Sequence, residues 1–520
     1  MRRITLALLI VVVGLFMAGC GSQSSTTSNN PPGNTAPVGM TITDTPPQGV
    51  TVLFFQLSIT GATLTSSTGT QVSLLSSTNP IPVNVSQLQS ELFFLGATNV
   101  AGGTYNNLSV TFANPQLTIY NGSGSAIGSC ANDTVCQITP SLTTGSSWTV
   151  SFSSTSTPPF SVTLTAASPV AFKLDIHLDT VIQSDLSLDL SVPNGVTVSV
   201  ISPPPPRLGK VRGTIQTVTS SSGSSSGQFT LQTWWGRTFT IDVNGSTNYE
   251  NFPTGANCTD TAGSIGCLAA GQYVKVTVTL QSDGSLLATD VDYLAPSAQL
   301  SVEGTIIGLS TSNGNTIMDL ILLWEPSSSM SNMLPLGHFA QVTVPPTASY
   351  AINWNGFTFT APSGVTLSFA SASDLQVGQQ VLVVVQGTVN TSGAAVSSAF
   401  GPPGVTFTAS DITLETSQIT GTVASVPTSS GSFTLATFPV FFVPPSATPG
   451  SPPSWAPVII TVQTSANGAT TLTNFSSLST LAVNNVVSVD GWVFSTPPPT
   501  GAITVAADQV ILRTGVTPLF

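Results

Sequence analysis

Three short sequence anchors recur in the same order, three times, along the second half of the chain. They are a strand with an internal Gly, a Leu followed three residues later by Gly or Asn, and an Ala close to an Asp. The anchors are Val211–Ile215, Leu268–Val276 and Ala288–Val291 in the first copy, Val302–Ile306, Leu375–Val383 and Ala409–Ile412 in the second, and Ile419–Val423, Leu481–Val489 and Ala507–Val510 in the third. A repeated order of this kind predicts three copies of one domain.

The anchors have a physical interpretation. A Gly inside a strand permits the sharp bend at which a small barrel turns its corner. Gly or Asn after the Leu tolerates positive φ in a turn, and the Val residues that follow alternate as in a strand. The copies resemble domain-of-unknown-function family 5666, which implies a compact OB-like β-barrel. Each copy is far longer than the roughly 20–45 residues of a stacked repeat, so we expect separate barrels in series.

The region before the repeats predicts a β-sandwich, because many short alternating strands are separated by turn residues. Three motifs, Asp44-Thr-Pro, Ile59–Leu64 and Ala101–Tyr105, resemble domain-of-unknown-function family 4382. The resemblance implies a transthyretin-like sandwich on a bacterial surface lipoprotein, with no catalytic residues.

The expected fold is therefore all-β, with an N-terminal transthyretin-like sandwich and three OB-like barrels. The expected divisions are a signal peptide (1–19), a flexible tether (20–37), the sandwich (38–200), a Pro-rich linker (201–209) and barrels at 210–297, 300–416 and 417–515.

The N-terminus predicts export and lipid anchoring. Arg2 and Arg3 precede an apolar segment that is too short to span a bilayer and ends at Ala18-Gly19-Cys20. This ending resembles the bacterial lipoprotein signal, in which the Cys is acylated, although Met17 replaces the usual Leu. Gly21 in place of Asp favours the outer membrane, if the cell has one. An ordinary secretory signal with a chance Cys is the alternative.

Four further cysteines lie in turn-rich segments. Cys130 and Cys136 form one local pair, and Cys258 and Cys267 form another. Because an exported chain meets an oxidising compartment, two local disulfides are expected. A metal site is the alternative, but the spacing does not match that of zinc ligands and no His is near.

One group of acidic residues suits a divalent cation. Alternation would place Asp175, His177 and Asp179 on one face of a strand, and Asp185, Ser187 and Asp189 on one face of the next. A turn between the two strands would bring these side chains to one surface. Oxygen ligands of this kind suit Ca²⁺. The alternative is the solvated face of an ordinary hairpin. No other cofactor is expected.

Charge limits the partners. Only 6% of the residues are charged and the formal net charge is −12, which removal of Arg2 and Arg3 lowers by two. Nucleic acid is therefore not expected as a partner. Neutral glycans suit such a surface better, and Trp234, Trp235 and Arg237 form the best candidate platform. Core or loop packing of these three residues is the alternative.

The sequence favours a lipid-anchored envelope protein with a structural, adhesive or display role and no catalysis. Its expected partners are the bilayer, through Cys20, and a glycan or envelope protein. Glycan binding through exposed Trp residues is the alternative hypothesis. A hydrolase is a remote third one, because His177 and His338 are the only histidines and no motif places an acid–base pair in a cleft.

Overall fold

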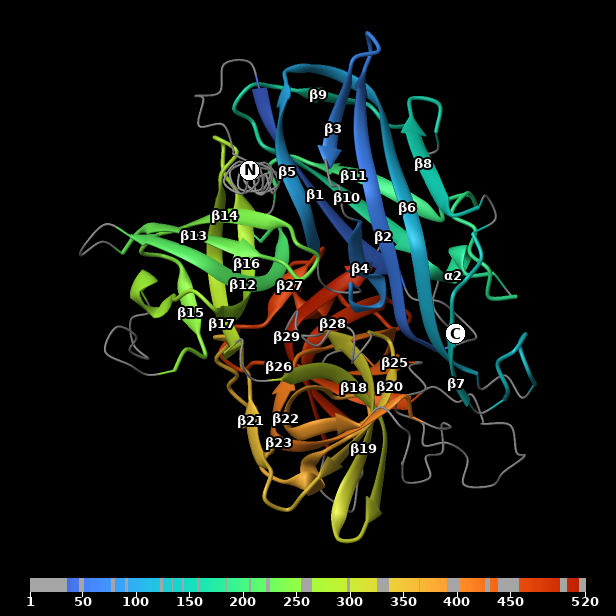
Figure 1. Cartoon of the computed structure of the whole chain (residues 1–520), viewed down its shortest axis with the longest axis vertical. Coiled ribbons are helices and arrows are strands. Elements are labelled where there is room, and N and C mark those ends of the chain that lie inside the picture. The colour runs from blue at the N-terminus through green and yellow to red at the C-terminus, as the bar shows by residue number, and fades with distance from the viewer. Residues whose placement is uncertain are drawn as a thin grey trace, which may run out of the picture.

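The computed structural model confirms the all-β fold, a sandwich followed by three small OB-like barrels (Figure 1). It describes residues 35–513 except 46–50, 76–79, 89–91, 122–124, 133, 143–144, 157–158, 184, 205–206, 221–224, 254–263, 297–299, 325–335, 364, 391–402, 426–430, 438–457 and 496–502. The predicted signal peptide and Cys20 therefore lie outside the described residues. No helix in the described part of the chain is long and apolar enough to cross a bilayer.

The sandwich contains eleven strands, a 3-10 turn and one short helix. They are β1 (Thr35–Thr45), β2 (Thr51–Ser66), β3 (Gln71–Leu75), β4 (Ile81–Asn84), η1 (Val85–Gln87), β5 (Phe93–Ala101), β6 (Gly103–Asn121), β7 (Thr134–Ile138), β8 (Ser147–Ser153), β9 (Val162–Leu164), β10 (Val170–His177), α2 (Leu178–Val181) and β11 (Val196–Ile201). The first strand begins inside the segment expected to be tether.

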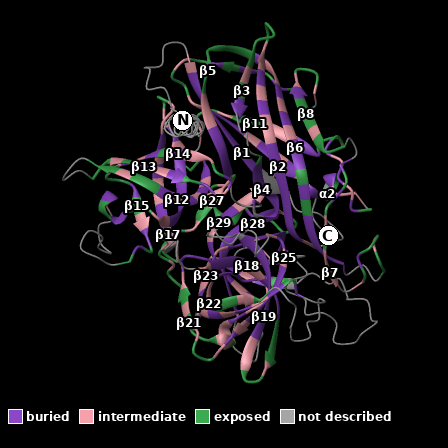
Figure 2. Cartoon of the chain, in the orientation of Figure 1, coloured by how far each residue is buried: buried purple, intermediate pink, exposed green. Residues whose placement is uncertain are grey.

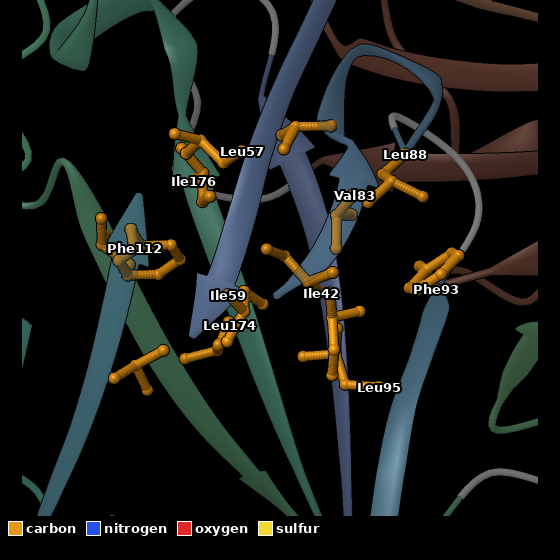
Figure 3. Close-up of a cluster of buried hydrophobic side chains, with 14 of the residues drawn as sticks. Ile42, Leu57, Ile59, Val83, Leu88, Phe93, Leu95, Phe112, Leu174 and Ile176 are labelled. Carbon is orange, nitrogen blue, oxygen red and sulfur yellow. The ribbon is translucent and has the colours of Figure 1, made fainter. Parts of the chain in front are cut away.

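Two sheets enclose the sandwich core. One has the order β11–β10–β1–β5, in which β1 and β10 run parallel. The other has the order β3–β2–β6–β7, with β4 paired to β2 and both β8 and β9 paired to β6. Alternation along β6 places Leu108, Val110 and Phe112 inward, where each is fully buried, and Ser109 and Thr111 outward. Figure 3 shows Phe112 among the core side chains from both sheets.

Each repeat forms a closed five-stranded barrel with a short sixth strand. The first has β12 (Gly209–Ser220), β13 (Gly227–Gln232), β14 (Thr238–Val243), β15 (Asn248–Glu250), β16 (Gln272–Leu280) and β17 (Leu286–Pro296). The second has β18 (Ser301–Ser312), β19 (Asn315–Trp324), β20 (Phe339–Val344), β21 (Ser349–Ile352), β22 (Gln380–Asn390) and β23 (Val405–Glu415). The third has β24 (Ser417–Ser425), β25 (Ser432–Thr437), β26 (Val458–Thr464), β27 (Thr471–Thr473), β28 (Val486–Ser495) and β29 (Ile503–Arg513).

The strand order is the same in all three barrels. In the first, β12 pairs with β13, β13 with β14, β14 with β17 in parallel, β17 with β16, and β16 with β12 again. The second and third barrels close in the same way. Closure leaves no open sheet edge within the five strands, which suits a small domain.

The recurring turn is the one expected from the sequence. Gly271, Gly378 and Asn484 all have positive φ, between 73° and 92°. The backbone N–H of each donates to the carbonyl oxygen of the opening strand of its own barrel, at Ile215, Ile306 and Val423 respectively. The turn therefore fixes the fourth barrel strand against the first. A one-turn 3-10 segment precedes it each time, at η2 (Ile265–Cys267), η3 (Ala372–Asp374) and η5 (Leu478–Thr480).

Each barrel closes on its own strands and the three follow one another along the chain, as expected, but they are not isolated from one another or from the sandwich. Ile307, Ile321, Leu323 and Phe339 of the second barrel join the hydrophobic core of the sandwich. Trp492 and Phe494 of the third barrel join the core of the second. Figure 2 shows buried residues continuing across these contacts. Neither the low charge of the chain nor the length of each repeat shows that apolar residues also lie on the outer faces of the barrels.

The strand Gly offers a test of the barrel geometry. A Cβ at Gly213 would lie 2.4 Å from the carbonyl oxygen of Gln232, on the neighbouring strand. Gly213→Ala should therefore force a backbone shift and destabilise the protein by about 1–3 kcal/mol. Urea unfolding followed by fluorescence measures this. Gly61→Ala, at a strand Gly with nothing within 4 Å of the added Cβ, is the matched control. Equal unfolding midpoints for the two variants would contradict the prediction.

Candidate functional site

Polar side chains from the first two barrels meet at a buried contact, which we call the junction cluster. It consists of Arg212, Asn251, Lys275, Asp292, Glu303, Asn353, Asn355, Gln380 and Glu415. Arg212, Lys275 and Asp292 lie side by side on three paired strands of the first barrel, β12, β16 and β17. Gln380 and Glu415 are paired in the same manner on β22 and β23. Strand alternation points these side chains away from the barrel cores, and the facing barrel covers them.

The Arg212–Glu303 ion pair is the most direct contact between the two barrels. Two guanidinium nitrogens donate to the two carboxylate oxygens, and the Gln380 amide donates to the same carboxylate. The Glu303 side chain is 4% exposed. Burial alone would raise the pKa of Glu303, but the Arg212 guanidinium lowers it below the usual value. Removing one partner of such a pair costs about 3–5 kcal/mol, because it leaves a buried uncompensated charge.

Lys275 is the second cation of the cluster. Its ammonium lies 3.2 Å from Asp292 Oδ2 and 4.0 Å from Glu415 Oε2. It also donates to the carboxamide oxygen of Asn355 at 3.2 Å. Burial acts to lower the pKa of Lys275, but the carboxylates of Asp292 and Glu415 more than offset it, so that the net shift is upward.

Asn353 connects all three barrels. Its side-chain amide donates to both carboxylate oxygens of Glu415 at 3.0 Å and to Asp292 Oδ2 at 3.3 Å, and its side-chain oxygen accepts from Asn251 at 2.7 Å. The indole N–H of Trp492, in the third barrel, donates to its backbone oxygen at 2.7 Å. One loop of the second barrel therefore satisfies polar groups on both neighbours.

A small pocket opens beside the cluster, toward the sandwich. Leu88 and Phe93 of the sandwich line it together with Lys210, Arg212, Glu303 and Thr416. Two ion pairs of the junction cluster, Arg212–Glu303 and Lys275–Glu415, form part of its wall.

Trp234, Trp235 and Arg237 pack against the sandwich, which was the alternative to a glycan-binding platform. These residues lie in the β13–β14 turn, and Trp235 is 8% exposed. The Trp235 ring contacts Phe93 of the sandwich, with ring centroids 5.7 Å apart, and Trp234 packs against the same core. Arg237 donates to the carbonyl oxygen of Leu95 at 2.6 Å. The turn directs both indoles to one side, where a strand would have separated them, and locks the first barrel onto the sandwich. No Trp whose side chain is described is classed as exposed.

The two paired strands expected to carry the Asp/His cation site do not form among the described residues. His177 ends β10, Asp179 lies in α2, and the expected second strand over 186–192 is replaced by turns. Asp185 and Asp189 accept the backbone N–H groups of Ser187 and Ser191, as turn-forming Asp residues do. The strands beside β10 are instead β11 and β1, where the register partners of Asp175 are Thr197 and Thr43. Among described side chains, no group of three His, Cys, Asp or Glu residues could hold a metal.

One predicted disulfide is confirmed. Cys130 and Cys136 are bonded, with their Cα atoms 5.7 Å apart. Cys267 is also disulfide-bonded, and its expected partner, Cys258, lies outside the described residues.

The fold defines a multi-domain all-β protein with three OB-like barrels. Residues 212–292, within the first barrel, match the family model described as Domain of unknown function (DUF5666). The resemblance of the first repeat to that family is thus confirmed. No curated protein matches the chain.

Two solved structures are similar over their own length. They are the Drosophila structure described as Unr CSD456, at 10% identity and a TM-score of 0.13, and a single-stranded DNA binding protein from Thermus aquaticus, at 12% identity and a TM-score of 0.15. The first match covers 59% of this chain and 98% of the other, and the second covers 42% and 93%. Superpositions of this quality carry no functional argument.

Glu250 adds a titratable carboxyl next to the junction cluster. It is 8% exposed and accepts from the Asn248 amide. Burial and the neighbouring carboxylates of Asp292 and Asp290 raise the pKa of Glu250 to about 8, against the opposing effect of Lys275 and Arg207. The folded protein therefore holds a proton at a pH where the unfolded chain has lost it.

This difference predicts a pH-dependent stability. Glu250 contributes fully to the free energy of unfolding below pH ~4.5. This contribution is lost as the pH rises to ~8, by at most about 1.4 kcal/mol per pH unit. Glu250→Gln cannot ionise, so its melting temperature should rise relative to wild type between pH 5 and pH 8. Thermal melts across this range measure the effect. Asp283→Asn, at an exposed turn carboxylate, should keep the wild-type profile. Parallel profiles for wild type and Glu250→Gln would contradict the prediction.

Proposed function

We propose that the protein is an exported scaffold of the cell envelope, anchored by lipid on Cys20 and without catalytic activity. The observation that carries this proposal is the way the chain uses its few charges. Arg212, Lys275 and Glu303 are buried between barrels, where they join domains and do not face a substrate. A chain that commits its strongest polar groups to internal contacts is suited to holding a shape.

The outer face of the sandwich supports a display role. Ser73, Thr63, Ser109 and Ser151 lie in register across β3, β2, β6 and β8, and Thr111 pairs with Thr149 in the next row. The hydroxyls of Ser109 and Ser151 hydrogen-bond at 3.0 Å and those of Thr111 and Thr149 at 2.9 Å. Such an uncharged face favours a neutral glycan or an envelope protein over nucleic acid, which needs clustered cations.

The N-terminal pattern supports the anchor. A basic start, an apolar segment and Ala18-Gly19-Cys20 are typical of a lipoprotein signal. Two or more acyl chains on one Cys would make membrane attachment nearly permanent. The resemblance of the first domain to domain-of-unknown-function family 4382 is consistent with a surface lipoprotein, and Gly21 favours the outer membrane.

Metabolic labelling tests the anchor. The full chain is expressed in a bacterium fed an alkyne fatty acid, and the label is detected on the purified protein. We expect label and membrane fractionation for wild type, and loss of both for Cys20→Ala. The matched control is Cys130→Ala/Cys136→Ala, which lacks the confirmed disulfide and should keep the label. An unlabelled wild-type protein, or a labelled Cys20→Ala variant, would contradict the proposal.

A further inference from the structure

The most unusual feature of the junction cluster is an amine held against a carboxamide in a buried site. Lys275 Nζ lies 3.2 Å from Asn355 Oδ1, across the contact between two domains. Asp292 Oδ2 is 3.2 Å from the same nitrogen, and Glu415 Oε2 is 4.0 Å away. A nucleophile, an acyl group and two proton carriers are thus all present.

We propose that Lys275 and Asn355 are joined by an intramolecular isopeptide bond that the protein forms without an enzyme. The bond would link Nζ of Lys275 in β16 to Cγ of Asn355 in the loop after β21. It would connect the first and second barrels covalently and close a loop between residues that are 80 positions apart.

The reaction balances with no other reactant. The carboxylates around Lys275 favour its ammonium form, so the reaction starts from the neutral amine that forms when Nζ gives one proton to Asp292. The freed Nζ lone pair attacks Cγ of Asn355, and Nζ then loses a second proton. The resulting tetrahedral carbon then expels Nδ2, which takes a proton and leaves as ammonia. One C–N bond forms and one breaks, with no change in oxidation state.

The two carboxyl groups have distinct positions for this chemistry. Asp292 Oδ2 is close enough to accept the proton from Nζ directly. Burial raises the pKa of Glu415, with Glu303 and Asp292 acting in the same direction and Lys275 against it. Glu415 Oε2 lies 4.0 Å from Nζ, so a protonated Glu415 is a proton source beside the reacting pair. The Glu415 carboxyl is already oriented by the amide of Asn353.

Proximity replaces the activation that an enzyme would supply. The 3.2 Å contact joins Nζ to Oδ1, which is bonded to the carbon that Nζ would attack. Holding the two side chains together in this way makes an amide exchange effectively unimolecular. Lys275 is 8% exposed, so that little water competes for the acyl carbon. The Asn355 backbone N–H donates to Asn353 Oδ1 at 3.0 Å, and this contact holds the loop in place.

Asn355 has a competing reaction that the same experiment separates. It precedes Gly356, and attack by the Gly356 backbone nitrogen would deamidate it through a cyclic imide. Deamidation adds about 1 Da after hydrolysis, whereas isopeptide formation removes about 17 Da, the mass of ammonia, because the amine of Lys275 becomes the acyl acceptor.

Mass spectrometry of the full chain provides the test. The protein is purified, reduced and alkylated, and then digested with chymotrypsin. We expect a branched peptide that contains both Lys275 and Asn355 and is about 17 Da lighter than the two linear peptides together. Separate unmodified peptides, or a peptide deamidated at Asn355, would overturn the proposal.

Single-residue variants test the role of each side chain in forming the crosslink. Lys275→Arg and Asn355→Ala should give only linear peptides. Glu415→Gln, which keeps the hydrogen-bonding shape, should leave most of the protein uncrosslinked. Asn353→Asp is the matched variant at the neighbouring Asn. In the wild-type protein, a branched peptide joined through Asn353 in place of Asn355 would identify a different acceptor and overturn the proposed pairing. The wild-type measurement decides the proposal even if every variant fails to fold. It is also independent of the anchor, because lipid on Cys20 changes neither peptide.

Discussion

The contact between the first two barrels depends on matched charges in a place that water hardly reaches. Arg212 and Glu303 occupy the same position of two successive repeats, directly before the strand Gly, and they pair with each other. Lys275 and Asp292 extend the row on one barrel, and Glu415 faces them from the other. Each charge would be costly to bury alone, so the two barrels stabilise each other only in one relative arrangement.

The remaining contacts follow from this arrangement. With the second barrel fixed against the first, its loop through Asn353 reaches Trp492 of the third. The Trp235 turn holds the first barrel to the sandwich. Thr118 of the sandwich donates to the carbonyl oxygen of Gly337 in the second barrel at 2.7 Å. The side chains that resembled a sugar platform or a set of cation ligands are thus used for packing and turns.

The sequence predicted local geometry well because local geometry has local causes. A Gly at 213, 304 and 421 is required where a neighbouring carbonyl oxygen approaches, and Gly271 adopts the positive φ that its turn needs. Alternation within β16 puts Lys275 on the outside of its barrel. It could not show that another barrel covers that face. The available signal was an opposite-charge pair at one repeat position in a chain with only 6% charged residues. Trp234 and Trp235 pack, as one of the two interpretations expected, but the sequence did not show what they pack against, because a tight turn, which alternation does not describe, points both toward the sandwich.

The central claim is that the four domains pack against one another as a single compact particle. Small-angle X-ray scattering of the purified chain measures this directly. A compact chain of 520 residues should have a radius of gyration of about 24 Å, with a scattering curve that matches a single globular particle. A radius above about 35 Å, with a curve fitted only by separately moving domains, would contradict the claim.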